Sequence, residues 1–435
     1  MKKFFNYVIP AIIGMLVTSF YVIVDGMFVG QGVGSSALAA INIAFPPTLI
    51  ATALTLIISV GGSTLVSMSL GSGETEEAIN KFNQSFILLI ISAIVLFLVG
   101  TFLSKPLAYA LGSPDSLIGD VHDYIRFYFL FSVPLVLSNG LNYFLRNDGA
   151  PKLAMYAMIA GALTNIFLDY VFIFIFQWGV AGAAIATGLG QLISTIIPII
   201  YFLRGKGILR FKKCEISFKV LKDITGIGFP SFLTQSAIAV VTMAFNMVIL
   251  REIGESGVAV YSIISYAITV LNMVLGGIAQ GVQPLLSFYY GAKEEEKIKY
   301  YYSLSLKSGL ISAVVNFGIC FFFGKGIISL FTSDKELISI TYNAFNLFNL
   351  GSFFAAINII NSSYLQSIKM SKASNLICLL RGFITIQVSL LILPKFLGNS
   401  GIWLSNFSGE LLVFLIAKLF LMKDQSLSFR EEAVL

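Results

Sequence analysis

Long apolar runs, separated by short polar or glycine- and proline-rich turns, fill most of the chain. A backbone in lipid must satisfy its own hydrogen bonds, so runs of this length predict membrane-spanning helices. Six runs lie in the first half, at about residues 8–31, 41–70, 84–104, 121–145, 153–177 and 180–203. Six more follow at about 225–250, 259–290, 303–331, 338–366, 373–394 and 401–422. The pattern predicts an all-α integral membrane protein with twelve transmembrane helices.

The composition supports this interpretation. Hydrophobic residues make up 57% of the 435 residues and charged residues only 11%, whereas a soluble domain carries about 25% charged residues. So few charges could not cover a water-exposed surface. The first apolar run, from Phe4 to Val24, is longer than the roughly 7–15 residues of a signal-peptide core, and we expect it to be retained as the first helix.

The two halves of the sequence are internal repeats. A gap-free shift of 220 residues places identical residues opposite one another: Pro10 and Pro230, Gly34 and Gly254, Ala39 and Ala259, Gly61 and Gly281, Ser67 and Ser287, Gly71 and Gly291, Glu74 and Glu294, Glu76 and Glu296, Leu145 and Leu365, Lys152 and Lys372. Because six is an even number of crossings, both copies have the same orientation and are parallel repeats. We expect two six-helix lobes with a central cleft for a transported substrate.

The pattern divides the chain into four regions. The N-lobe, residues 1–204, contains the first six helices, and the C-lobe, residues 225–423, contains the other six. Between them, residues 205–224 form an interlobe linker rich in lysine and arginine, which we expect to be a solvated basic loop on the membrane surface. Residues 424–435 form a tail.

Lysine and arginine are unevenly distributed between the two sides of the membrane. Of the 28, 21 would lie on the side of the N-terminus, 6 on the opposite side, and one, Arg381, within a helix. The positive-inside rule then predicts a multi-pass plasma (inner) membrane protein with both termini, the linker and the tail in the cytoplasm. The basic residues lie between apolar runs rather than on one face, so the net charge of +6 does not indicate a nucleic-acid partner.

The sequence lacks the residues of common enzyme sites. A single histidine, His122, excludes a two-histidine metal site, and the three cysteines are widely separated. The segment from Gly318 to Lys325 has the wrong spacing for a phosphate-binding loop. We therefore predict no enzymatic activity and no cofactor, and pumping would have to use an ion gradient.

Two acidic residues lie inside apolar runs, Asp25 in helix 1 and Asp169 in helix 5. An ionised side chain at the bilayer centre costs about 2.5–3.5 kcal/mol or more, and no lysine or arginine lies deep within the first six runs. Each acid must therefore be protonated, bind a cation or face water. This is the behaviour expected of a site that takes up H⁺ or Na⁺.

Residues with neutral oxygens accompany these acids. Asn165 precedes Asp169 by four residues, so both project from one face of a helix. Asn142 in helix 4 and Thr187 in helix 6 could supply further oxygens, or could only join neighbouring helices by hydrogen bonds. Asn165 and Thr187 could serve Na⁺, whereas the paired acids alone suit H⁺. Apart from a Na⁺ at this site, the sequence predicts no metal ion.

Several motifs resemble those of the multidrug and toxic compound extrusion (MATE) family. The stretch Pro10 to Ala40, with Tyr21, Val24-Asp25 and Gly34-x-x-x-Leu38-Ala39-Ala40, resembles its first helix. The segment Leu145-Arg146-Asn147-Asp148-Gly149-Ala150-Pro151-Lys152 is similar to its loop after helix 4. Asn165-x-x-x-Asp169 matches its helix 5, and Thr187 follows eighteen residues later. The likeness covers nearly the whole chain.

The resemblance implies a function and a site. The resemblance is to the DinF-like or MepA-like branch of the family. In the DinF-like branch, a cation site in the N-lobe is formed by the positions that match Asp25, Asn165, Asp169, Thr187 and, nearby, Asn142. Pro10 matches a helix 1 proline implicated there in bending. The resemblance implies secondary active export of small-molecule drugs, cationic or amphipathic organic compounds, in antiport with H⁺ or Na⁺. We expect the protein to work as a monomer in the lipid bilayer.

The second half departs from the NorM-like branch, which places acids in helices 7, 8 and 10. This sequence has amides there: Asn246, Gln280, Gln283, Asn358 and Asn361. Its charges within helices 11 and 12 are Arg381 and Glu410, which could neutralise each other on neighbouring antiparallel helices. We expect a structural ion pair, with a role in substrate binding as the alternative.

A lipid-linked saccharide flippase of the same superfamily is the alternative function. A flippase should have a cationic cleft for pyrophosphate, whereas Arg381 is the one clearly membrane-embedded basic residue. A membrane receptor or embedded hydrolase would need a large extramembrane domain or a buried nucleophile and base. The sequence therefore favours an exporter.

Overall fold

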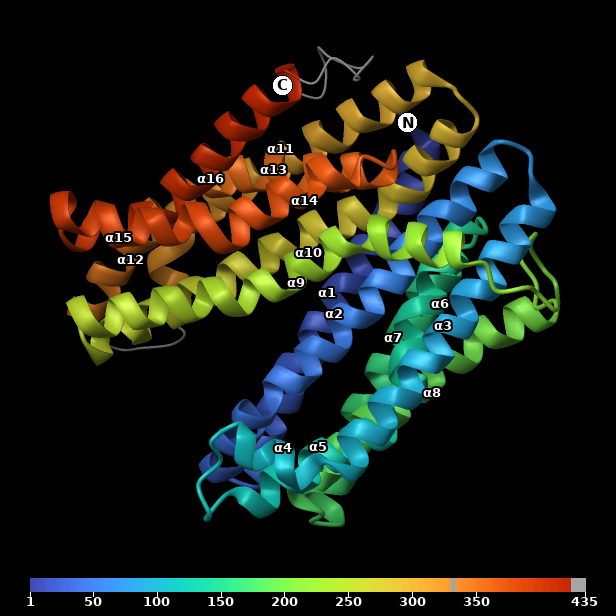
Figure 1. Ribbon diagram of the computed structural model, residues 1–435. Coiled ribbons are helices and arrows are strands. Elements are labelled where there is room, and N and C mark those ends of the chain that lie inside the picture. Colours follow the sequence, from blue (N-terminus) through green and yellow to red (C-terminus); the bar gives the residue numbers. More distant parts are fainter. Residues whose placement is uncertain (330–333, 424–435) are drawn as a thin grey trace. The chain divides into compact units, whose positions relative to one another are not determined.

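The computed structural model describes residues 1–329 and 334–423, and this part of the chain is built from helices (Figure 1). The N-lobe contains α1 (Lys2–Gly32), α2 (Ser35–Gly71), α3 (Thr75–Phe102), α4 (Ser104–Ala110), α5 (Ile118–Leu130), α6 (Ser132–Asn147), α7 (Pro151–Asp169), the π-helical turn η1 (Tyr170–Ile175) and α8 (Gly179–Leu203). The second half contains α9 (Phe218–Glu252), α10 (Glu255–Gly291), α11 (Glu295–Ser329), α12 (Lys335–Asn349), α13 (Ser352–Ser367), α14 (Ser371–Leu379), η2 (Leu380–Ile384), α15 (Thr385–Leu397) and α16 (Asn399–Lys423). The predicted tail, 424–435, lies outside the described residues.

These helices supply the predicted number of membrane spans. Within the described residues, eleven helical segments are long and apolar enough to cross a membrane, and the bent pair of α5 and α6 makes the twelfth. The helix boundaries also show the internal repeat, because α10, α13 and α16 begin and end 220 residues after α2, α6 and α8. The prediction of an all-α membrane protein is therefore confirmed, and positions 220 residues apart are structurally equivalent.

Four predicted helices are interrupted. The run at 121–145 is divided into α5 and α6, which are bent by 53°, and at this break Ser132 donates its hydroxyl to the carbonyl of Ala93 at 2.9 Å. The run at 338–366 is divided into α12 and α13. The π turns η1 and η2 interrupt two more spans. Such breaks depend on contacts with other helices, so a continuous apolar run does not reveal them.

The chain divides into two compact units. The first comprises Met1–Phe232 and Ser287–Lys293. The second comprises Leu233–Leu286 and the described residues from Glu294 onward. The N-lobe thus forms one unit with the linker, the first part of α9 and the last turns of α10. The boundary between the two units lies inside α9. The division into two lobes with a linker at 205–224 stays a prediction.

The helices of the N-lobe pack closely around α7 and α8. These two helices lie side by side, α1 packs against α7, and α6 contacts α2, α3 and α8 (Figure 1). Because α1 packs along α7, which is the fifth predicted helix, Asp25 and Asp169 are carried by neighbouring helices.

Residues 204–217, here called the strap, connect α8 to α9 and are docked on the N-lobe. Leu209 is fully buried in the core formed with α3, α6 and α8. The ring of Phe211 contacts that of Phe86, with centroids 4.7 Å apart, and that of Phe82 at 5.5 Å. The segment therefore differs from the expected solvated loop, because two apolar side chains of the basic run enter the core.

Hydrogen bonds to distant residues hold the strap in place. The Asn83 side chain accepts from the backbone N–H of Lys212 at 3.0 Å, and the Gln84 side chain accepts from that of Ser217 at 2.9 Å. The carboxylate of Asp148 accepts from the backbone N–H groups of Ile208 and Leu209. Burial raises the pKa of Asp148, and these hydrogen bonds partly oppose the shift.

Two glycines of α2 allow helices to approach closely in the same unit. A Cβ added at Gly61 would lie 2.0 Å from the carbonyl oxygen of Ile224, and one at Gly71 would lie 1.8 Å from that of Phe288. Only glycine fits at such backbone contacts. This packing explains why the ends of α9 and α10 belong to the N-terminal unit.

The C-terminal unit has its own core. The helix pairs α15–α16 and α11–α13 pack against each other, and α12 contacts α16. Phe245 of α9 lies between Tyr261, with ring centroids 5.0 Å apart, and Phe348, at 5.2 Å.

Candidate functional site

Asp25 and Asp169 are brought together by the packing of α1 against α7. Asp169 is the last residue of α7, directly before the π turn η1, and it is fully buried. Asp25 lies within α1, the helix that packs against α7. π turns often occur at functional sites, and here one places a carboxyl group inside the lobe.

Three of the four carboxylate oxygens of these two acids are buried without a donor. Among the described residues, both oxygens of Asp169 lack a hydrogen-bond partner, and so does Oδ1 of Asp25. An ionised carboxylate only accepts, so two such groups cannot satisfy each other. A proton shared between them, or a bound cation, would supply the missing positive partner.

Asn165 and Thr187 adjoin this pair. Asn165 lies one turn before Asp169 on α7, and its Nδ2 donates to Thr187 Oγ1 of α8 at 3.3 Å. That bond leaves the Oδ1 of Asn165 buried and without a partner. The amide is therefore oriented with a free oxygen, which is the type of ligand that Na⁺ prefers.

Asn142 is held by a different set of contacts. Its Nδ2 donates to the carbonyl of Ser138 at 2.6 Å, and its Oδ1 is also buried without a partner. Ser138 donates its hydroxyl to Gln191 Oε1 at 2.5 Å, and Gln191 Nε2 donates to the hydroxyl of Tyr21 at 3.5 Å. This chain of contacts links α6, α8 and α1, whereas no hydrogen bond within residues 1–329 and 334–423 joins Asn142 to the acids.

Sequence reasoning missed Gln191. This residue follows Thr187 by four positions in a helix that has no charged residue, so both lie on one face of α8. An amide at that spacing was a usable signal. Pro10, the predicted hinge residue, lies inside α1 and is buried.

Close contact between α7 and α8 supports the site. A Cβ added at Gly190 would lie 2.7 Å from the carbonyl oxygen of Gly161 and 2.9 Å from Cβ of Asn165. The glycine pair thus lets the two helices approach at the level of Asn165, one turn from Asp169.

The C-lobe charges are also brought together. Arg381 Nε donates to Glu410 Oε1 at 2.6 Å. Asn358 Nδ2 donates to Glu410 Oε2 at 2.8 Å and to the carbonyl of the same residue at 2.9 Å. Glu410 is therefore buried with a donor on each carboxylate oxygen.

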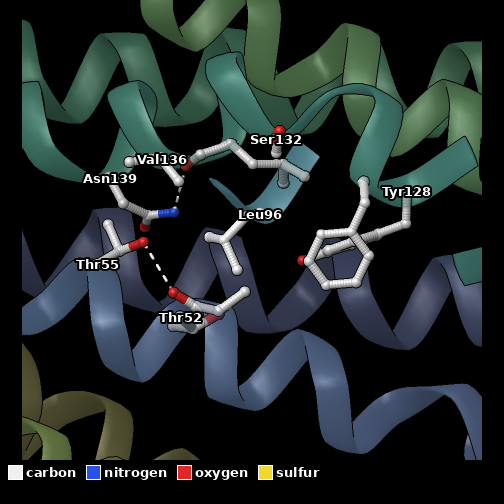
Figure 2. Close-up of a pocket in the computed structure, with 10 residues that line it drawn as sticks. Thr52, Thr55, Leu96, Tyr128, Ser132, Val136 and Asn139 are labelled. Carbon is white, nitrogen blue, oxygen red and sulfur yellow. Dashed lines mark hydrogen bonds between the residues drawn. The ribbon is translucent and has the colours of Figure 1, made fainter. Parts of the chain in front are cut away.

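A small pocket lies elsewhere in the N-lobe, among α2, α3, α5 and α6 (Figure 2). Its polar groups include Thr52, Thr55, Tyr128 and Asn139, and Asn139 donates to a backbone carbonyl of α6 at 2.9 Å. The lining contains neither of the two acids. Its neutral groups give it no charge with which to hold an ion.

The donor set of the acid pair is suited to a monovalent cation. No group of three or more histidine, cysteine, aspartate or glutamate side chains that could hold a metal ion occurs in residues 1–329 and 334–423. Two carboxylates with neutral amide and hydroxyl oxygens are hard ligands, which hold Na⁺ or a proton rather than a soft transition metal.

Comparisons of the sequence with known proteins agree on one transporter family. The MatE family profile matches residues 10–171 and 230–391, two segments offset by the repeat length. The multidrug export protein MepA of Staphylococcus saprophyticus is 26% identical over 434 residues, covering 98% of this chain and 94% of that protein. MepA of Staphylococcus aureus is 25% identical over 430 residues, with the same shares covered.

A solved structure has the same fold. The outward-facing conformation of a multidrug resistance MATE family transporter of the MOP superfamily superposes with a TM-score of 0.91, covering 96% of this chain and 94% of that one at 24% sequence identity. The likeness establishes a twelve-helix, two-lobe architecture.

Proposed function

Because the chain belongs to the MatE family, we propose that it is a secondary active exporter of cationic or amphipathic organic compounds, coupled to H⁺ or Na⁺ at a cation site in the N-lobe. One observation carries the proposal: Asp25 and Asp169 lie on helices that pack against each other, and three of their four carboxylate oxygens are buried without a donor. The similarity to MepA proteins, which are named multidrug exporters, supports the substrate class.

The coupling follows from the charge of this pair. Uptake of a cation neutralises the carboxylates of Asp25 and Asp169, which removes the cost of holding them ionised in the membrane. The packing of α1 against α7 then changes, with Pro10 as the hinge in α1, and the compound is released outward. Release of the cation to the cytoplasm restores the starting state. The cation can shift the equilibrium between the two states only by the difference between its binding free energies in them.

Ethidium efflux from purified protein in liposomes tests this function, with pH and Na⁺ gradients imposed separately. We expect efflux under one gradient, which identifies the ion, and its loss in Asp25→Asn. Full efflux by that variant under the same gradient would refute the assigned site.

Absence of efflux under either gradient, with protein shown to be folded, would favour the second candidate, a flippase for lipid-linked saccharides. Arg381 is the observation in its favour, since a cationic group within the membrane could hold a phosphate. Its pairing with Glu410 weakens this role.

A further inference from the structure

Arg381 has hydrogen-bonding capacity that its ion pair does not use. It lies in η2, near the middle of the span Ser371–Leu397, and its side chain is 22% exposed while that of Glu410 is 2% exposed. A guanidinium has five N–H donors, and the bond from Nε to Glu410 uses one. No other partner of Arg381 occurs in the part of the chain that the structure describes.

Glu410 holds Arg381 at a single point. Arginine and carboxylate side chains frequently form two parallel hydrogen bonds, but here only Nε is engaged. The second oxygen of Glu410 is taken by Asn358. The terminal nitrogens of Arg381 therefore have no partner among the described residues, on a side chain that Glu410 holds at Nε.

The membrane restricts what these nitrogens can meet. A charged group facing lipid chains at mid-membrane is costly, and intramembrane arginines face a bundle interior or a water-filled cavity. A planar set of N–H donors matches the geometry of a carboxylate. Glu410 repels a free anion at this place, so the best ligand brings its own positive charge together with its carboxylate.

We propose that Arg381 binds the carboxylate of transported zwitterionic amphipathic compounds, with Glu410 and Asn358 holding the guanidinium in position. This inference rests on the proposed export function and adds a substrate class to it. It is specific to the C-lobe, because the equivalent N-lobe positions are Gly161 and Gly190, which have no side chains to form such a pair.

Rhodamine B and its ethyl ester make a matched pair of probes, because they differ only in whether the carboxylate is free or esterified. The dissociation constant of each dye is measured by fluorescence anisotropy on purified full-length protein in detergent, and export is measured in parallel in liposomes. The test variant combines Arg381→Gln with Glu410→Gln, since two neutral amides can hydrogen-bond each other and leave no unpaired charge. Arg251→Gln is the control, because Arg251 is an 84% exposed arginine at the end of α9.

We expect the preference for rhodamine B over its ester to fall about ten- to hundredfold in the double variant, as for the loss of a charged hydrogen bond. The control should keep the wild-type preference. Glu410→Gln alone should raise the preference, because the competing negative charge is gone while the amide oxygen can still accept from Arg381 Nε and hold the guanidinium in position. An unchanged preference in the double variant, or a fall in Glu410→Gln, would overturn the proposal.

The binding measurement separates this inference from the export function. The wild-type protein could prefer rhodamine B, lose this preference in the double variant, and yet export neither dye. That result would contradict export and support the carboxylate site. Ester export that persists in the double variant with an unchanged preference would contradict the site and leave export standing.

Discussion

The two lobes share one repeat but hold acidic side chains in opposite ways. In the N-lobe, Asp25 and Asp169 carry buried oxygens that have no donor among the described residues. In the C-lobe, Glu410 accepts hydrogen bonds from Arg381 and Asn358. A buried carboxylate without donors has a strong tendency to take up a cation, whereas one with two donors is already compensated. If the proposed function is correct, the N-lobe exchanges ions and the C-lobe does not.

Equivalent positions show how the acids are lost from the C-lobe. Asp25 and Asp169 correspond to Phe245 and Ser389. Phe245 is fully buried and stacks on Tyr261. The C-lobe therefore fills with an aromatic ring the place where the N-lobe has its first carboxyl group.

The reverse exchange occurs about two helical turns before Asp169 on α7. Gly161 and Gly190, which let α7 and α8 touch, correspond to Arg381 and Glu410. Side chains at both positions would force the N-lobe helices apart. The same backbone thus supports either close helix contact beside free acids or a side-chain ion pair without free acids.

The largest expected effect comes from breaking the C-lobe pair. Glu410→Ala leaves the charge of Arg381 without its carboxylate, and we expect the free energy of unfolding to fall by about 3–5 kcal/mol. Chemical denaturation in detergent micelles measures this. Glu255→Ala, at an exposed acid in the first turn of α10, should change it little. A fall below about 1 kcal/mol for Glu410→Ala would mean that the pair is not compensated as described.

Removing a free acid from the N-lobe should act on transport instead. We expect Asp169→Asn to reduce gradient-driven ethidium efflux about 100-fold, the upper part of the range for coupling between sites. Its stability should not fall, because a buried carboxylate without donors is replaced by a neutral amide. Asp115→Asn, at an exposed acid of the same lobe, is the control. Unimpaired efflux, or a marked loss of stability, would contradict the contrast between the lobes.

Crowding the glycine contact should disturb the N-lobe site indirectly. Gly190→Ala places a Cβ against Gly161 and Asn165, and overpacking of this kind costs about 1–3 kcal/mol. We expect a weaker apparent affinity for the coupling ion, measured from the ion dependence of ethidium efflux. Gly119→Ala is matched to it, since a Cβ there meets nothing within 4 Å. Equal ion dependence in the two variants would show that close packing at Gly190 does not support the site.

The apolar runs and the repeat predicted the helices because both are local properties of the sequence. The buried acids were also predictable, since Asp25 and Asp169 contrast with their apolar neighbours. That they share a site followed only from the family resemblance, because their distance depends on how α1 packs on α7. Whether the site couples transport stays a prediction.

Other features depend on partners far away in the sequence. The linker reads as a basic loop, and nothing in it shows that Asn83, Gln84 and Asp148 would bind its backbone. The break before Ser132 likewise depends on a carbonyl of α3. Hydrophobic patterning reports burial along one segment and does not report such pairings.

The smallest expected effect concerns the strap. Asp148→Ala leaves the N–H groups of Ile208 and Leu209 without their acceptor, and we expect the strap to undock more often, at a cost of about 1 kcal/mol. Trypsin cleavage after Arg210 and Lys212 should then be about fivefold faster, because proteolysis follows the open population. Asp148→Asn should be cleaved at nearly the wild-type rate, since burial already raises the pKa of Asp148 and an amide oxygen can accept the same bonds. Equal rates for the alanine and asparagine variants would show that the carboxylate does not hold the strap.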